Sequence, residues 1–159
     1  MAKRVSHETS ICPVARSLDA IGDWWSLLIV REAMVGKRRF GEFQKGTGIA
    51  KNILSARLRR LAAYGILQAA PAAEGGPHQD YVLTPKGRAL FPVLVALRQW
   101  GETFSFTAGE PCAALLDRAS GQPLRPLELR AQDGRLVDLG DVELVLPDAG
   151  QAAAEAAGL

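Results

Sequence analysis

The sequence predicts an α+β protein, mainly α-helical with one small β hairpin and with a β ribbon appended after it. Apolar residues recur at helical spacing over much of residues 12–104, and two short strand-like runs flank a Pro- and Gly-rich loop within that range. Apolar and polar residues alternate in parts of residues 105–146. The chain has 159 residues, 48% hydrophobic and 23% charged, which fits about one globular domain with a core.

The first two predicted helices follow residues 1–11, which are predicted to be a flexible N-terminal arm. The run "PVARSLDAI" predicts a helix, because Pro13 is tolerated in a first helical turn and the apolar residues behind it share one face. Gly22 interrupts this helix, and Asp23 is a suitable N-cap for a second one, "WWSLLIVREAM". Gly36 ends the second helix.

The next two predicted helices are a short one and a long one. The run "RRFGEFQKGTG" predicts one or two helical turns and then a tight connection at Gly46 and Gly48. The following helix is expected from about Ala50 to Tyr64, and Gly65 stands where a C-terminal cap belongs.

A hairpin and a last helical region complete this part of the chain. The runs "ILQAA" and "DYVLT" predict two strands around the loop "PAAEGGPHQ". Thr84 and Pro85 are suited to the cap and first position of a helix, and Pro92 is expected to kink that helix or split it in two. Its apolar stripe consists of Leu90, Leu94, Leu97, Trp100 and Phe104.

Residues 105–146 differ from the rest of the chain. The runs "PLELRA" and "RLVDLGDVELVL" flank the turn candidate "QDG", which predicts an acidic β ribbon. A dimer-extending arm, a lid over an effector and an electrostatic shield against nonspecific DNA all remain open as its role. Residues 147–159 have no convincing apolar face and are predicted to be a disordered tail.

Charge is distributed unevenly along the chain. Residues 1–104 contain 15 Lys and Arg against 8 Asp and Glu, a net charge of +7, whereas residues 105–159 contain 4 against 9, a net charge of −5. Residues 37–60 contain eight basic residues and a single acidic one, Glu42. A basic block of this kind inside a folded domain indicates a polyanionic partner.

The helix over residues 50–64 explains what that basic block faces. Leu54, Leu58 and Leu61 fall on one side, which belongs in the core. The opposite side carries Arg, Asn and Ser, which pair with base edges in the DNA major groove. With the hairpin that follows, this is a helix-turn-helix with a wing, and its partner is predicted to be double-stranded DNA. The candidate DNA-binding residues are Lys37, Arg38, Lys45, Lys51, Asn52, Ser55, Arg57, Arg59 and Arg60.

Several motifs in this stretch, in order, resemble the HxlR-type transcriptional regulators, a branch of the MarR-like winged helix-turn-helix proteins. They are Cys-Pro, Gly-Asp, Trp-Ser-Leu-Leu-Ile, Arg-Phe-x-Glu-Phe, Leu-Ser-x-Arg-Leu and Tyr-x-Leu-Thr-Pro-Lys-Gly, between Cys12 and Phe104. The resemblance implies a bacterial homodimer, clasped through its first and C-terminal helices, that binds inverted-repeat operators. The implied interface residues are Val14, Leu18, Leu90, Leu94, Leu97, Trp100 and Phe104.

The sequence departs from the family pattern at several positions. Trp24 stands where relatives commonly have a long basic residue, and the wing tip "AAEGGPHQ" has no Arg or Lys, which leaves any groove contact there to His78 and the backbone. Some relatives carry paired cysteines in a similar tail, but here only Cys112 is present. No metal site or cofactor is therefore predicted.

Two kinds of signal could control such a protein. Cys12 is a redox-sensing candidate, because the start of a helix favours the reactive thiolate and some relatives sense oxidants at the matching position. The alternative is a small capping residue with no redox role. A small-molecule effector could instead lie between the C-terminal helices, the ribbon and three tryptophans, Trp24, Trp25 and Trp100.

Other functional classes find little support in the sequence. The chain has only two histidines and no Gly-rich phosphate loop before a helix, so catalysis is not predicted. No apolar run approaches the roughly 18 residues that span a bilayer, and no signal peptide is evident, which predicts a cytoplasmic protein. The remaining alternative is a winged helix that binds only other proteins.

Overall fold

The computed structural model describes residues 6–72 and 78–147. The chain divides into two compact units, residues 1–112 and 113–159. The first five residues of the predicted arm, most of the predicted wing tip and the predicted tail from residue 148 onward lie outside the described residues.

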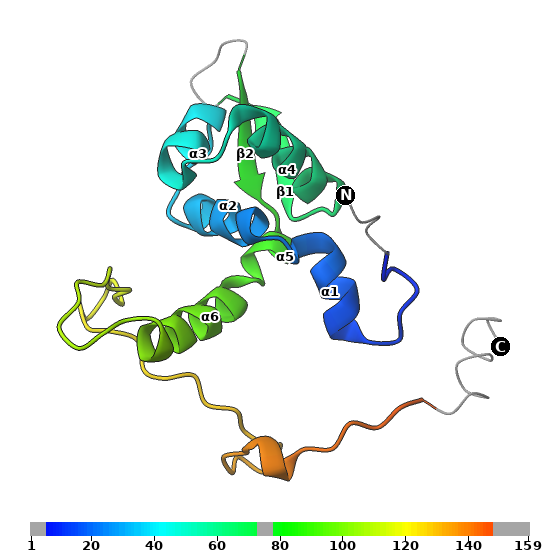
Figure 1. Ribbon diagram of the computed structural model, residues 1–159, viewed down its shortest axis with the longest axis vertical. Helices are drawn as coiled ribbons and strands as arrows, with labels where there is room; N and C mark the ends of the chain where they lie inside the picture. The colour runs from blue at the N-terminus through cyan, green and yellow to red at the C-terminus, as the bar shows by residue number, and fades with distance from the viewer. Residues whose placement is uncertain (1–5, 73–77, 148–159) are drawn as a thin grey trace. The chain divides into compact units, whose positions relative to one another are not determined.

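The first unit contains six helices and one hairpin among its described residues (Figure 1). In chain order they are α1 (Pro13–Ile21), α2 (Trp24–Met34), α3 (Phe40–Thr47), α4 (Lys51–Ala63), β1 (Leu67–Pro71), β2 (Gln79–Leu83), α5 (Pro85–Arg88) and α6 (Phe91–Phe104). These elements confirm the predicted α+β class with a small hairpin. None of the helices in the described residues is both long enough and apolar enough to cross a lipid bilayer.

The helix boundaries lie where local chemistry places them. The Asp23 carboxylate accepts hydrogen bonds from the backbone N–H groups of Trp25 and Ser26, at 3.2 and 3.0 Å, and so caps α2. The Thr84 hydroxyl accepts from the Gly87 N–H at 3.1 Å and caps α5. The predicted break at Pro92 is confirmed, because α5 ends at Arg88 and Pro92 lies in the first turn of α6.

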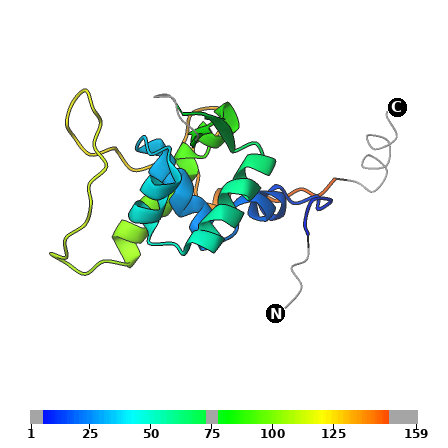
Figure 2. The ribbon, with the colours of Figure 1, turned by 90° about the horizontal axis from the view of Figure 1, so that it is seen from above.

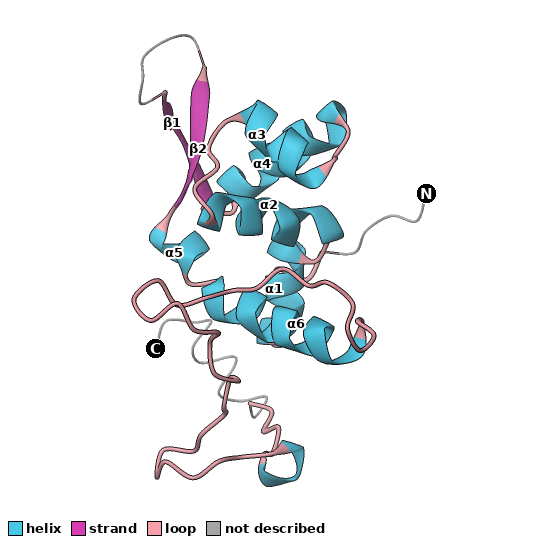
Figure 3. Cartoon of the chain, turned by 90° about the vertical axis from the view of Figure 1, so that its left-hand side faces the viewer, coloured by secondary structure: helices cyan, strands magenta, loops and turns pink. Residues whose placement is uncertain are grey.

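The hairpin is the wing, and the α2–α3 loop is attached to it. Its strands pair antiparallel, with Leu67 opposite Leu83 (Figure 3). The Tyr81 N–H donates to the Arg38 carbonyl at 2.8 Å, and Arg39 forms an isolated antiparallel bridge with Asp80. The wing is therefore anchored to the start of α3 by backbone pairing.

The core lies where α2, α3 and α4 meet, and these three helices lie side by side when the molecule is seen from above (Figure 2). Its fully buried side chains come from all three helices and from the connections around them. They are Ile29, Val30, Phe43, Ile49, Leu54, Leu58, Leu61 and Leu67. Helix α6 lies on the opposite side of α2 from α3 and α4 (Figures 1 and 3).

The second unit corrects the prediction of an appended β ribbon. Its described residues, 113–147, contain two isolated bridges, Leu116 with Pro123 and Arg130 with Leu136, and one short 3-10 helix, η1 (Leu139–Asp141), but no continuous strand pair. The predicted turn is present, with Gly134 at φ 87°. Pairing extends from it over only a few residues, where the Ala131 N–H donates to the Arg135 carbonyl and the Val137 N–H to the Leu129 carbonyl. It goes no further because a two-stranded ribbon needs a layer to pack against, and none of the described side chains here is buried.

Candidate nucleic-acid interface

The turn between α3 and α4 fixes the direction of the predicted recognition helix. Gly48 adopts a left-handed backbone with φ 71°, and its N–H closes α3 by donating to the Gln44 carbonyl at 2.9 Å. Ile49 is buried directly after it and fixes the connection to the core. Helix α4 then begins at Lys51, two residues further on.

Helix α4 has the two faces that its sequence predicts. Leu54, Leu58 and Leu61 are fully buried. Lys51, Asn52 and Arg59 are exposed and Ser55 is half-buried, so a polar, basic stripe lies opposite the core. The Arg59 guanidinium reaches back to the Ser55 carbonyl, with its Nε 3.4 Å away. We call these four residues the α4 stripe.

The first turn of α4 is also suited to an anion. Ala50 occupies the N-cap and has no side-chain oxygen to accept from the first backbone N–H groups. The first turn contains Lys51 and no acidic residue. The positive end of the helix dipole and a lysine therefore coincide at the start of the α4 stripe.

Two predicted DNA-binding arginines instead contact the protein itself. Arg57 Nε lies 3.1 Å from Oδ1 of Asp23, the carboxylate that caps α2. Arg60 donates to the backbone carbonyl of Asp19, and its guanidinium lies 5.5 Å from the centre of the Tyr64 ring. Both side chains join α4 to α1 and α2, and neither belongs to the α4 stripe. A helical projection cannot show this, because the partners come from distant parts of the chain.

The remaining predicted basic residues belong to α3 and the loop before it. Lys45 is exposed in the last turn of α3, and Arg38 is exposed in the loop. Lys37 forms an ion pair with Glu32 of α2. Lys45 and Arg38 are therefore exposed, whereas Lys37 is engaged by a carboxylate.

Glu32 of α2 forms a buried ion pair that was not predicted from the sequence. Its side chain is 7% exposed, and Oε1 lies 2.7 Å from Arg31 Nη2 while Oε2 pairs with Lys37. Burial raises the pKa of this carboxyl, but the hydrogen bonds and charges of Lys37 and Arg31 outweigh burial and leave the pKa below its ordinary value. Gly46 of α3 packs on this pair, since a Cβ atom there would collide with the Glu32 carboxylate. The pair therefore joins α2 to the loop before α3, and α3 packs on it through Gly46.

The predicted redox candidate lies at the start of α1. Cys12 is exposed and occupies the N-cap position of α1, where its backbone N–H donates to the Ser10 hydroxyl at 3.1 Å. Part of the predicted flexible arm is held nearby, because Ser6 and His7 hydrogen-bond to the Asp19 carboxylate. Cys112 also carries an exposed thiol.

The residues implied for dimer contact lie on α1 and α6, except for Leu90, the residue directly before α6. Trp100 and Phe104 are 59% and 70% exposed, and their rings contact each other with centroids 5.6 Å apart. Val14, Leu18 and Leu97 are also exposed. Leu90 and Leu94 differ, since they are half-buried against the core. Apolar exposure on this scale is typical of an interaction surface.

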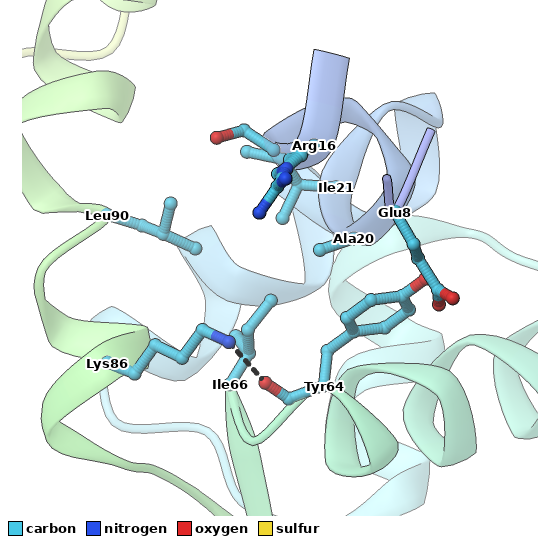
Figure 4. Close-up of a pocket in the computed structure, with 9 residues that line it drawn as sticks. Glu8, Arg16, Ala20, Ile21, Tyr64, Ile66, Lys86 and Leu90 are labelled. Carbon is cyan, nitrogen blue, oxygen red and sulfur yellow. Dashed lines mark hydrogen bonds between the residues drawn. The ribbon is translucent and has the colours of Figure 1, made fainter. Parts of the chain in front are cut away.

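A cavity of about 370 Å³ lies between α1, the end of α4 and α5 (Figure 4). Its apolar wall includes Ile21, Ile66 and Leu90, and the Lys86 ammonium at its edge donates to the Tyr64 carbonyl at 2.8 Å. The predicted effector site was expected among three tryptophans, but none of them lines this cavity. Trp24 is 84% exposed and Trp25 packs on the core.

A helix pair with a tight turn, a half-exposed second helix and a pinned antiparallel hairpin together define a winged helix-turn-helix protein. Residues 20–108 match the family model described as HxlR-like helix-turn-helix. The chain therefore belongs to that family. The family consists of transcriptional regulators rather than enzymes, and this chain is a transcriptional regulator of the helix-turn-helix type.

Several known proteins resemble the chain closely. It is 36% identical over 121 residues to Rv3095 of Mycobacterium tuberculosis, an uncharacterised HTH-type transcriptional regulator, covering 76% of this chain and 70% of that protein. The crystal structure of PA1607, a proposed transcription factor, has a TM-score of 0.85 at 55% identity, with 89% of this chain and 99% of that chain covered. The redox regulator HypR in its reduced form has a TM-score of 0.51 at 35% identity, with 58% and 92% covered.

Proposed function

We propose that this regulator binds a pseudo-palindromic DNA operator as a homodimer, with the α4 stripe in the major groove. The single observation that carries the proposal is the stripe itself, an exposed row of Lys, Asn, Ser and Arg opposite a buried leucine face. In a dimer, two such helices would enter successive major grooves about 34 Å apart, so the operator should have two matching half-sites.

The residues of the α4 stripe and their neighbours would make different kinds of contact with DNA. Asn52 and Arg59 have the side chains that pair with adenine and guanine edges, and Ser55 can donate or accept. Lys51 and Lys45 would hold phosphates on either side. Arg57 and Arg60 are left out of this set, because they have partners within the protein.

The homodimer would form through the exposed apolar faces of α1 and α6. Val14, Leu18, Leu97, Trp100 and Phe104 would be covered by the same residues of a second copy, as an isologous interface requires. Without such a partner, these side chains would remain in water at a cost of about 25 cal/mol per Å² of apolar surface.

The proposed function is tested by fluorescence anisotropy on the DNA upstream of the protein's own gene and on a scrambled duplex, across a salt series. Tight, selective binding that weakens steeply with salt is expected, because each phosphate contact releases counterions. No binding to either duplex at low salt would favour a winged helix that serves only as a protein-interaction module.

Replacing Arg59 with alanine is expected to weaken operator binding by about 1–3 kcal/mol and to relax specificity at one base pair. The same anisotropy titration measures this, on the operator and on variants with single base-pair changes. Arg118→Ala is the matched control, since Arg118 is an exposed arginine of the second unit. An equal loss on operator and scrambled DNA would assign Arg59 to a phosphate instead.

Redox control through Cys12 is a second element of the proposed function. It is supported by the exposed thiol at the start of a helix in the proposed dimer interface and by the resemblance to HypR, itself a redox regulator. In the proposed step, a peroxide accepts two electrons and two protons from two thiols, so that hydrogen peroxide becomes two waters and an alkyl peroxide becomes an alcohol and a water. The thiols lose their protons and form a disulfide, either across the dimer or with Cys112.

Cys12→Ser is expected to abolish the loss of DNA binding that hydrogen peroxide causes in the unmodified protein. The measurement is operator anisotropy before and after oxidation, followed by addition of a thiol reductant to restore binding. Cys112→Ser distinguishes the two pairings, because only a disulfide with Cys112 requires that residue. A Cys12→Ser protein with the full oxidant response would remove Cys12 from the mechanism.

A further inference from the structure

We propose that a cavity between the end of α2, the strand β2 and the start of α6 binds an organic anion with an aromatic or apolar body. The cavity has a volume of about 440 Å³, which falls in the range of small-molecule sites. Three cationic side chains, two aromatic rings and a methionine line it, namely Lys37, Arg38, Arg88, Tyr81, Phe91 and Met34.

The charge of this cavity indicates an anion. Among the described residues, its lining includes three cations and no carboxylate. Glu32 pairs with Lys37, which leaves the charges of Arg38 and Arg88 at the cavity. By contrast, Arg98 on α6 is paired with Glu102, and Arg130 in the second unit is paired with Glu128. Like charges around one cavity repel, and an anion between them relieves that repulsion.

The Arg88 side chain and the Arg38 backbone are held in position before any ligand arrives. Arg88 Nη1 donates to the Leu83 carbonyl at 2.8 Å, and a guanidinium has four further N–H donors for a carboxylate or sulfonate. The backbone of Arg38 is fixed on both sides, by its N–H to Glu42 at 2.8 Å and by its carbonyl to Tyr81 at 2.8 Å. Groups held in place beforehand lose less entropy on binding.

The walls of the cavity favour a ligand with an apolar or aromatic body over a bare inorganic anion. Tyr81 is half-buried and its ring packs edge-on against Phe43 of the core, with centroids 6.5 Å apart. Phe91 is 45% exposed at the start of α6, and Met34 packs partly on the core. A flat ring between Tyr81 and Phe91 would cover apolar surface while its charged group meets the arginines.

The position of the cavity suggests how such a ligand could act. Its lining comes from α2 and the loop after it, from the wing strand β2, and from α5 and α6. A bound ligand would therefore touch the DNA-reading part of the fold and also a helix of the proposed dimer interface. That regulatory consequence rests on the proposed function, whereas ligand binding itself does not.

The test uses 2-naphthoate as the probe and the methyl group of Met34 as the reporter, in the full-length protein without DNA. The chain has only two methionines, so protein labelled with methyl-¹³C methionine gives a simple spectrum, and Met34→Leu assigns the cavity signal. Saturable movement of the Met34 methyl signal is expected on titration with 2-naphthoate. The neutral isostere 2-naphthamide should bind about tenfold more weakly, because it lacks the charge that the arginines pair with.

Arg88→Gln and Arg38→Gln are each expected to weaken naphthoate binding by about tenfold. Arg16→Gln, which removes a cation from the cavity beside α1, is the matched control and should leave it unchanged. Thermal melting establishes that each variant is folded, and either arginine variant alone suffices for the comparison.

Three results would overturn the proposal. They are an unmoved Met34 signal up to the solubility limit of the probe, equal binding of the amide, or unchanged naphthoate binding in the folded Arg88→Gln and Arg38→Gln variants. If those variants lost affinity for duplex DNA but not for naphthoate, the cavity arginines would be phosphate contacts. Because the titration contains no DNA, failure of the proposed operator binding would not affect it.

Discussion

Replacing Glu32 with alanine should lower the free energy of unfolding by about 3 kcal/mol, the lower end of the range for breaking a buried ion pair. The carboxylate is almost fully buried and pairs with both Arg31 and Lys37. The cost stays at the lower end because both cations are more than a third exposed and can be hydrated once the carboxylate is gone. Urea unfolding followed by circular dichroism measures the change.

The same residue predicts a pH dependence. Because the folded-state pKa of Glu32 lies below its ordinary value, its contribution to stability is complete above the unfolded-state pKa and disappears as pH falls through the folded-state pKa. The difference between the unmodified protein and Glu32→Gln should therefore shrink on acidification. A difference that stays constant from neutral to acidic pH would mean that the charge of Glu32 does not stabilise the fold.

Glu102→Gln provides the matched control for Glu32. Glu102 also pairs with an arginine, Arg98, but on a more exposed surface of α6. An exposed pair at this spacing contributes only about 0.3–0.5 kcal/mol. If the two glutamate variants were equally stable, the buried Glu32 pair would stabilise the fold no more than an exposed pair does.

Trp100→Ala should weaken the proposed homodimer by about 2–4 kcal/mol, the size expected of a tryptophan at the centre of an interface. Trp100 is 59% exposed in the isolated chain and its ring contacts that of Phe104, so the two rings form one apolar surface on α6. Sedimentation equilibrium over a range of concentrations measures the dissociation constant. Operator affinity should fall with it, because a monomer holds only one half-site.

Val35→Ala is the control for this prediction, since Val35 is an exposed apolar residue outside α1 and α6. It should leave the dissociation constant unchanged. A Trp100→Ala protein as dimeric as the unmodified one would place the interface elsewhere, and a strictly monomeric unmodified protein would remove the homodimer from the proposal.

The sequence alone was sufficient to predict the features that depend on residues close together in the chain. The caps at Asp23 and Thr84, the break at Pro92 and the leucine face of α4 all follow from residues within one or two helical turns. Each depends on spacing and backbone chemistry that a single stretch of sequence contains. These features position the α4 stripe, which explains why its exposure could be predicted from the sequence, whereas its contact with DNA stays a prediction.

The sequence alone was insufficient to predict contacts between residues that are far apart in the chain. Arg57 lies at the edge of the basic side of α4, but its partner is Asp23, more than thirty residues earlier. Glu32 follows a largely apolar stretch, and nothing in the neighbouring sequence indicates that Lys37 and Gly46 contact it. The prediction of a β ribbon was wrong for a related reason. Alternating apolar and polar residues in residues 105–146 indicate strands with one apolar face, but they do not show whether another layer packs on that face.

The backbone bond from Tyr81 to the Arg38 carbonyl has a mechanical consequence. Together with the bridge between Arg39 and Asp80, it clamps the hairpin partway along its length to the residues just before α3. A load applied at its loop end would pass through the clamp into the first turn of α3. Force on the wing would thus reach α3, the helix that precedes α4.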